Sequence, residues 1–81
     1  MMKRIGVVGI VIEDIIYAKE VNSILHEYAN IIVGRMGIPY KEKNLSVISI
    51  IVDGTSDEIS ALTGKLGKTN GVSVKSALTK A

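Results

Sequence analysis

The sequence predicts an α+β fold in which a four-stranded antiparallel sheet carries two helices on one of its faces. Two observations predict this fold. The segments follow the order strand, helix, strand, strand, helix, strand, and the first and third strands are the most apolar runs in the chain. Right-handed crossovers place these two strands at the centre of the sheet, where the most buried strands should lie.

The N-terminal half supplies a strand, a helix and a second strand. Residues 5–12 form a continuous apolar run of strand length that ends at two acidic residues. Asp14 is suited to cap a helix that runs to about residue 28. Apolar residues recur along that helix at spacings of three and four, which forms one buried stripe of Tyr17, Val21, Ile24, Leu25 and Tyr28. A second strand is expected over residues 31–36, ended by the glycine and proline that follow.

The C-terminal half repeats the order strand, helix, strand. After a polar connection over residues 39–44, a third strand is expected over residues 45–53, which are nearly all Val, Ile and Ser. Thr55 and Glu58 match a capping box at the start of a helix. Gly67 is suited to close that helix in a left-handed conformation. An Asn-Gly turn then leads into a half-exposed final strand with alternating apolar and polar residues.

Length and composition limit the classes of function. Residues 1–81 are expected to form one domain, whose core is marginal unless a disulfide, a metal or a partner subunit adds to it. The chain has no cysteine, which excludes disulfides, thiolate metal sites and thiol catalysis. Its net charge of +2 comes from interspersed charges, so no surface for nucleic acid or for a membrane is expected. The apolar run near the N-terminus is too short to span a bilayer and no cleavage site follows it, so we expect a cytoplasmic protein.

The predicted sheet has apolar side chains on both faces, which indicates self-association. Two helices can cover only one face of a four-stranded sheet, and the other face should then alternate with polar residues. In the first strand, however, Ile5, Val7 and Val11 point to one side while Val8, Ile10 and Ile12 point to the other. With about six residues per strand, the uncovered face measures about 400 Å², a size that usually marks an interaction site. We therefore expect a homo-oligomer, a dimer or a tetramer, that pairs through this face.

The second strand contains the most unusual stretch, and it provides a tentative ligand or subunit contact made of Gly34, Arg35, Gly37 and Tyr40. A guanidinium in an apolar strand needs a carboxylate, carbonyl groups, a bound anion or open water. One interpretation is a charge on an edge strand that prevents further strand pairing. The other is that Arg35 and Tyr40 line a contact with a small ligand or a subunit, and that the glycines allow close backbone approach.

No metal centre or catalytic centre is expected. His26 is the only histidine, and the residues one helical turn to either side are asparagines, which are weak ligands. A solvent-exposed helix residue is therefore the favoured interpretation of His26, and a metal shared between subunits is the weaker one. No serine or threonine has an obvious histidine partner, so we expect no catalytic residues, no cofactor and no enzymatic activity.

Three segments of the chain are similar to the iron-only hydrogenase system regulator family: KRIGVV at residues 3–8, IVGRMGIPY at residues 32–40 and VDGTSDEISALTGKLG at residues 52–67. The resemblance, which also includes GVSVK at residues 71–75, implies an ACT-like form of the ferredoxin-like fold. It further implies kinship with the C-terminal domain of the nickel-responsive transcriptional regulator and genomic association with hydrogenase maturation in anaerobic bacteria.

Two departures limit what the resemblance implies for a binding site. The nickel regulator binds its metal through several histidines and a cysteine, whereas this chain has one histidine and no cysteine. Amino-acid-binding ACT domains usually have a glycine at the first strand-to-helix turn, which here reads Glu13-Asp14-Ile15. A nickel site of that kind and an amino-acid site at that turn are therefore not expected.

The resemblance and the residues together predict an oligomeric ACT-like regulatory module that binds a small effector or a partner protein. No DNA-binding segment is expected before Lys3, so a role in transcription would act through another protein. Two alternatives remain open. One is a purely structural oligomerisation domain without a ligand, and the other is a small metal-binding sensor that uses His26 across a subunit contact.

Overall fold

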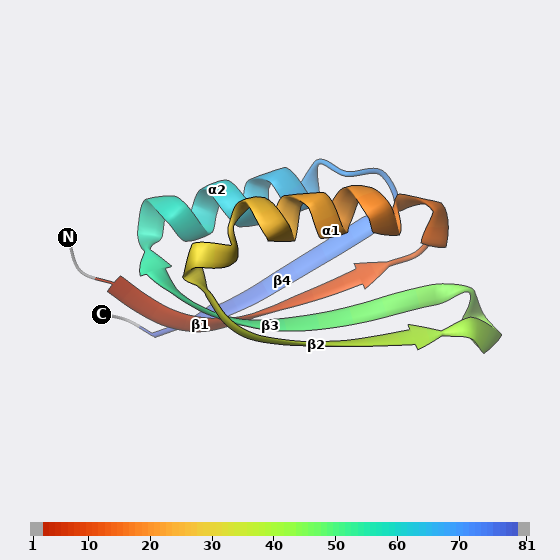
Figure 1. Ribbon diagram of the computed structural model, residues 1–81, viewed down its shortest axis with the longest axis horizontal. Coiled ribbons are helices and arrows are strands. Elements are labelled where there is room, and N and C mark those ends of the chain that lie inside the picture. Colours follow the sequence, from red (N-terminus) through yellow and green to blue (C-terminus); the bar gives the residue numbers. More distant parts are fainter. Residues whose placement is uncertain (1–2, 80–81) are drawn as a thin grey trace.

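A computed structural model describes residues 3–79 as a sheet layer and a helix layer (Figure 1). The sheet and the helices are formed, in chain order, by β1 (Lys3–Ile12), α1 (Ala18–Glu27), β2 (Ile32–Tyr40), β3 (Leu45–Thr55), α2 (Ser56–Gly67) and β4 (Val72–Leu78). All strand pairs are antiparallel, and the strand order is β2-β3-β1-β4. Both helices lie on the same face of the sheet (Figure 1). The predicted ferredoxin-like βαββαβ fold, with β1 and β3 at the centre, is confirmed.

The hydrophobic core lies between the two layers. It consists of alternate side chains of the central strands and the inward side chains of the helix layer, namely Val8, Ile10, Ile12, Val21, Leu25, Ile31, Ile48, Ile50, Val52, Ile59, Leu62 and Leu66. Each is at most 4% exposed. The predicted stripe on α1 is confirmed, because Val21 and Leu25 are buried and the other three members pack against the core. The apolar pattern of the chain therefore determines which side of the sheet the helices cover.

The first helix begins with a 3-10 turn over Ile15–Tyr17, before α1. The carboxylate of Asp14 accepts a hydrogen bond from the backbone N–H of Ile16 at 3.2 Å, so the predicted capping role is confirmed. A second 3-10 turn, Ala29–Ile31, follows the helix and leads directly into β2.

The second strand is longer than predicted. It does not end at Met36 but continues through Gly37 and Pro39 to Tyr40. The physical reason is that β2 is an edge strand. Proline has no N–H to donate to a neighbouring strand, but no hydrogen bond is lost when its nitrogen faces the free side of the sheet. The connection to β3 is accordingly short, a 3-10 turn over Lys41–Lys43 and Asn44 in the left-handed conformation (φ 54°).

The second helix starts as the sequence predicts but ends differently. The N–H of Glu58 donates to Thr55 Oγ1 at 3.2 Å and the N–H of Thr55 donates to Glu58 Oε1 at 2.8 Å, so the capping box is confirmed. The expected left-handed closure at Gly67 is wrong, because Gly67 is the last helical residue and the next residue is right-handed. The chain reverses instead at Gly71 (φ 70°), where a side chain would also meet the ring of Tyr17.

Removing the capping hydroxyl should destabilise the protein measurably. We expect Thr55→Ala to lower the free energy of unfolding by about 1 kcal/mol, because the N–H of Glu58 loses its acceptor. For a domain of this size, that loss corresponds to a fall in Tm of about 4–8 °C. Thr63→Ala is the matched control, since the Thr63 hydroxyl only donates to the Ser60 carbonyl within the helix at 3.3 Å. Thermal unfolding of both variants checks the prediction, and equal shifts would contradict it.

The capping box also predicts a pH dependence of stability. Hydrogen bonds from the backbone N–H and the side chain of Thr55 lower the pKa of Glu58. The folded state therefore favours the carboxylate, so its stabilising contribution is present above the ordinary glutamate pKa and is lost as pH falls through the lowered folded pKa. We expect wild type to be more stable than Glu58→Gln at neutral pH and the difference to shrink in acid. Urea unfolding of both proteins over that pH range measures this difference in the free energy of unfolding. A difference that does not change with pH would show that the charge of Glu58 does not contribute to it.

Candidate functional site

One face of the sheet is left open by the helices and is largely apolar. The open face carries seven large side chains that are 38–67% exposed: Ile5, Val7, Met36, Ile38, Tyr40, Val47 and Ile51. The register brings them into rows, so that Val7 lies opposite Ile51 in one row and Ile38 lies opposite Val47 in another. Polar residues interrupt the face on two strands, through Ser73 and Lys75 on β4 and Ser49 and Asp53 on β3. Apolar side chains on both sides of the sheet, as predicted from the sequence, are therefore observed.

A hollow of about 240 Å³ lies in the open face and is lined by Gly34, Arg35, Met36, Ser49 and Ile51. Small residues create it, because Gly34 and Ser49 stand among larger neighbours. A Cβ atom added at Gly34 would meet no atom within 4 Å, and one added at Gly37 would meet only Ile48 Cγ1 at 3.7 Å. Neither glycine is therefore required by close packing within the subunit.

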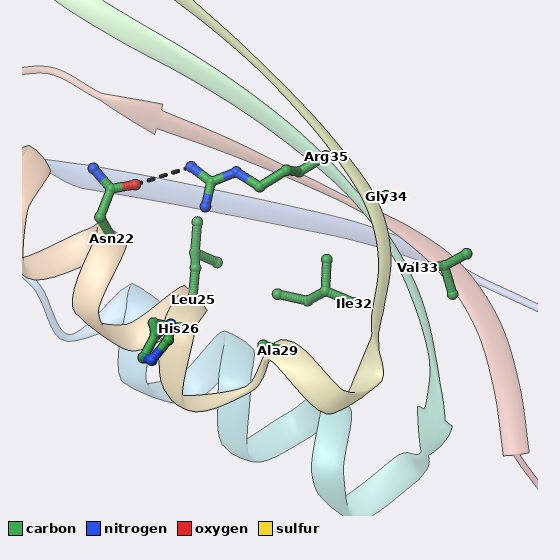
Figure 2. Close-up of a pocket in the computed structure, with 8 residues that line it drawn as sticks. All are labelled: Asn22, Leu25, His26, Ala29, Ile32, Val33, Gly34 and Arg35. Carbon is green, nitrogen blue, oxygen red and sulfur yellow. Dashed lines mark hydrogen bonds between the residues drawn. The ribbon is translucent and has the colours of Figure 1, made fainter.

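On the other side of β2, a groove of about 450 Å³ runs between this strand and α1 (Figure 2). Its upper end is polar, since Arg35 Nη2 donates a hydrogen bond to Asn22 Oδ1 at 2.9 Å. His26 lies one helical turn after Asn22 on the same helix and also lines the groove. Apolar atoms of Leu25, Ala29 and Ile32 line the remainder, and Val33 points away from the groove (Figure 2).

A β-bulge decides on which face the side chains of β2 lie. Ile32 pairs with Val52 and Gly34 pairs with Ile51, so Val33 is an extra residue without a partner. Because successive strand residues point to opposite faces, the extra residue exchanges the faces of everything that follows. Arg35 consequently pairs with the buried Ile50 and points to the helix side. Met36, Ile38 and Tyr40 are placed on the open face for the same reason.

The structure separates the four residues that the sequence grouped as one contact. Arg35 and Gly37 lie on the helix side, whereas Gly34 and Tyr40 lie on the open face with Ile51 and Leu45 as their pairing partners. Arg35 and Tyr40 therefore do not line one site within a subunit. The charge of Arg35 does lie on an edge strand, in agreement with the first interpretation.

The site gains two residues that sequence reasoning did not assign to it. Asn22 and His26 come from α1, and His26 had been considered only as a weak candidate for a metal ligand. Their spacing of four residues places them on one side of the helix, and the sequence alone indicates this shared side. Nothing in the sequence indicated that this side lies along β2. Such a neighbourhood becomes visible only when helix and strand are packed.

Metal-binding and membrane-spanning features are not found in the described part of the chain. Across residues 3–79, no three His, Cys, Asp or Glu side chains gather closely enough to hold a metal ion. In the same range, neither helix combines the length and the apolar character needed to cross a membrane. The groove is thus a site without a preformed ligand set for a metal.

The comparison with protein families decides the affiliation of the chain. Residues 4–76 match the TM1266-like family, which is described as "Iron-only hydrogenase system regulator, putative". The chain belongs to this regulator family. No curated protein matches the chain. The matched region includes both helices, all residues of the groove and the two central strands except Lys3, so the groove and the seven apolar residues of the open face lie within the family domain.

One solved structure is a relative of high identity, and two others share the fold. The uncharacterised protein TM1266 from Thermotoga maritima is similar to the chain with 39% identity and a TM-score of 0.90, over 96% of this chain and 99% of that one. A formyltetrahydrofolate deformylase from Pseudomonas putida KT2440 has 9% identity and a TM-score of 0.64, over 90% of this chain and 28% of the deformylase. The apo form of CPII, a nitrogen regulatory PII-like protein from Thiomonas intermedia K12, has 10% identity and a TM-score of 0.54, over 94% and 91% of the two chains. The last two similarities show a shared fold alone.

Proposed function

We propose that the protein is an oligomeric regulatory module that binds a small effector or a partner protein, and that it is not an enzyme. Membership of a regulator family supports the general role. The observation that carries the proposal is the open face of the sheet, on which seven large apolar side chains are 38–67% exposed. A contiguous apolar surface of this kind marks an interaction site on a soluble protein.

The area of the open face favours a second copy of the chain as its occupant. The strands contain 10, 9, 11 and 7 residues. Four strands at about 4.8 Å spacing and about 3.3 Å per residue then give a face of roughly 590 Å². Two such faces in contact remove roughly 1,200 Å² of projected surface from water, which reaches the lower end of stable interfaces. The strands are longer than the sequence suggested, which makes this surface larger than expected from the sequence.

The hollow at Gly34 supports the same occupant. Within the subunit nothing lies near the position of a Cβ atom on Gly34, so the missing side chain leaves space that only an outside group can fill. The neighbouring Met36 and Ile38 project from the same face and are 67% and 56% exposed. A side chain of this length from a second copy would fit such a depression, because a two-fold contact presents the same residues from both sides.

The two alternatives make different demands on the molecule. A purely structural oligomerisation domain needs the open face but not the groove between α1 and β2. A metal-binding sensor needs several ligands, and in the described residues His26 is joined in the groove by one asparagine and no carboxylate. The groove therefore favours an effector-binding module over both.

The experiment that tests the proposed function is sedimentation velocity over a dilution series, combined with a thermal-shift panel of amino acids, nucleotides, carboxylates and divalent metals. We expect a dimer or tetramer whose Tm rises with protein concentration, because association stabilises the folded state by mass action. A folded monomer at all concentrations would overturn the assembly. A defined oligomer whose Tm responds to no member of the panel would favour the structural domain instead.

A further inference from the structure

We propose that the groove between α1 and β2 binds a small aliphatic carboxylate, with the guanidinium of Arg35 as its anchor. This inference rests on the proposed function in one respect, since it names the chemical class of the effector. It places the effector on the helix side of β2, away from the open face. The residues that carry it are Asn22 and Arg35 at the polar end, His26 one helical turn further along α1, and the apolar atoms of the remaining lining.

The polar end of the groove offers a cation with free donors. A guanidinium has five N–H groups, and Arg35 uses one of them for the bond to Asn22 Oδ1. None of the residues that line the groove is acidic. Among residues 3–79, the only ion pair joins Glu27 and Lys65 at 2.7 Å, so Arg35 has no carboxylate partner there. The fork of an arginine matches the two oxygens of a carboxylate, which makes such a ligand its complement.

Asn22 and His26 add polar groups from α1 to the groove. The bond to Asn22 holds the guanidinium over the groove, where Figure 2 shows it above Leu25. His26 lines the same groove one helical turn further along α1, where its imidazole adds a polar group to the helix side. Arg35 from β2 and Asn22 from α1 thus meet at this end of the groove, and the bond to Asn22 is the side-chain hydrogen bond that Arg35 makes in the described residues.

The apolar part of the groove indicates what is attached to the carboxylate. Leu25, Ala29 and Ile32 present only hydrocarbon, and Leu25 is 1% exposed and forms a fixed floor. The volume of about 450 Å³ falls within the usual range of small-molecule pockets, about 300–1,000 Å³. A short aliphatic chain would cover this hydrocarbon while its carboxylate reaches Arg35.

Other ligand classes fit less well. A phosphate or nucleotide carries two or more charges, and the lining contains a single permanent cation. A divalent metal prefers carboxylate, thiolate or several imidazole ligands, whereas the lining offers one imidazole and one amide. A singly charged carboxylate with a hydrocarbon chain is the class that satisfies both ends.

The proposal is tested by NMR titration of the uniformly ¹⁵N-labelled full chain with sodium butyrate, butyramide and inorganic phosphate at constant ionic strength. Butyramide has nearly the same shape as butyrate but no charge. We expect saturable shifts with butyrate at the amides of Ala29, Ile32 and Arg35, and no saturation with the other two compounds. Saturation by butyramide, stronger binding of phosphate, or butyrate shifts confined to other residues would each overturn the proposal.

Two variants separate the anchor from its surroundings. Arg35→Gln removes the charge but keeps a polar side chain with N–H groups, and we expect it to raise the Kd for butyrate by about tenfold to a hundredfold. Arg4→Gln is the matched control, because it is the same chemical change at an arginine of β1 that does not line the groove. It should leave the Kd within about twofold of wild type. Equal effects of the two variants would count against an anchor at Arg35.

Failure of this inference can be distinguished from failure of the proposed function. A protein that binds butyrate in the groove but sediments as a monomer would keep the carboxylate site and lose the oligomer. An oligomer in which butyrate causes no saturable shift would keep the assembly and lose the carboxylate site. The oligomer mass and the Kd for butyrate are measured on the same preparation, so each proposal succeeds or fails on its own measurement.

Discussion

Ile51→Lys is expected to convert the oligomer into a folded monomer. Ile51 lies near the middle of the open face, opposite Val7 on β1 and beside the hollow at Gly34. It is 46% exposed in the isolated subunit, so a lysine there can remain in water and leave the subunit folded. In a face-to-face pair the same lysine would lose its water and meet an apolar surface, at a cost of several kcal/mol. We expect the dissociation constant to rise at least about a hundredfold, measured by sedimentation velocity.

Ile16→Lys is the matched control for this substitution. Ile16 is also an exposed isoleucine, at 70%, but it lies in the 3-10 turn that precedes α1 rather than on the sheet. The exchange is chemically identical, so its effect on charge and solubility is the same. We expect it to leave the oligomer mass unchanged. If Ile51→Lys also left the mass unchanged, the open face would not be the surface of association.

Gly6→Ala is expected to cause the second large effect, a loss of stability of the subunit itself. Gly6 is buried on β1 and pairs with Leu78 on β4. A Cβ atom there would collide with the Leu78 side chain and lie 2.7 Å from the carbonyl oxygen of Ala77, which is backbone and cannot rotate away. Overpacking of this kind costs about 1–3 kcal/mol. We therefore expect Tm to fall by roughly 5–20 °C in thermal unfolding.

Gly34→Ala is the same chemical change, but we expect it not to destabilise the subunit. A Cβ atom at Gly34 meets nothing within the subunit, so alanine there should be neutral or stabilise by about 0.4–1 kcal/mol through the unfolded state. Both alanines are best compared in the Ile51→Lys background, where association does not contribute to stability. A Gly34→Ala variant that unfolds as easily as Gly6→Ala would contradict the open space at Gly34 and the close contact at Gly6.

The fold could be predicted because its determinants are local. The apolar runs of β1 and β3, the stripe on α1 and the capping box of Thr55 each specify an element within a few residues. The end of β2 could not be predicted in the same way. Gly37 and Pro39 disfavour a central strand, and only the position of β2 at the edge of the sheet makes them acceptable. The crossovers already predict this edge position, but the expected boundary treats Gly37 and Pro39 as if they stood in a central strand, so it is placed too early.

The candidate site was predicted less well, for two physical reasons. Alternation along a strand already separates Gly34 and Tyr40 from Arg35 and Gly37, so the four residues could not form one contact within a subunit. Which pair faces the helices depends on the bulge at Val33, and the sequence carries no clear signal for it. The partner of Arg35 is a second long-range feature, since Asn22 lies 13 residues away on a different element.

Gly34 and Arg35 border both the groove on one side of β2 and the hollow on the other. Occupants of the two spaces would therefore rest on opposite sides of the same short piece of main chain, separated by the thickness of one strand. If a ligand in the groove shifts that main chain, the shift changes the affinity of one copy of the chain for another. Thermodynamic linkage then requires assembly to change the affinity for the ligand by the same factor. A free edge strand without a further neighbour is well suited to such communication, because only one ladder of hydrogen bonds resists its movement.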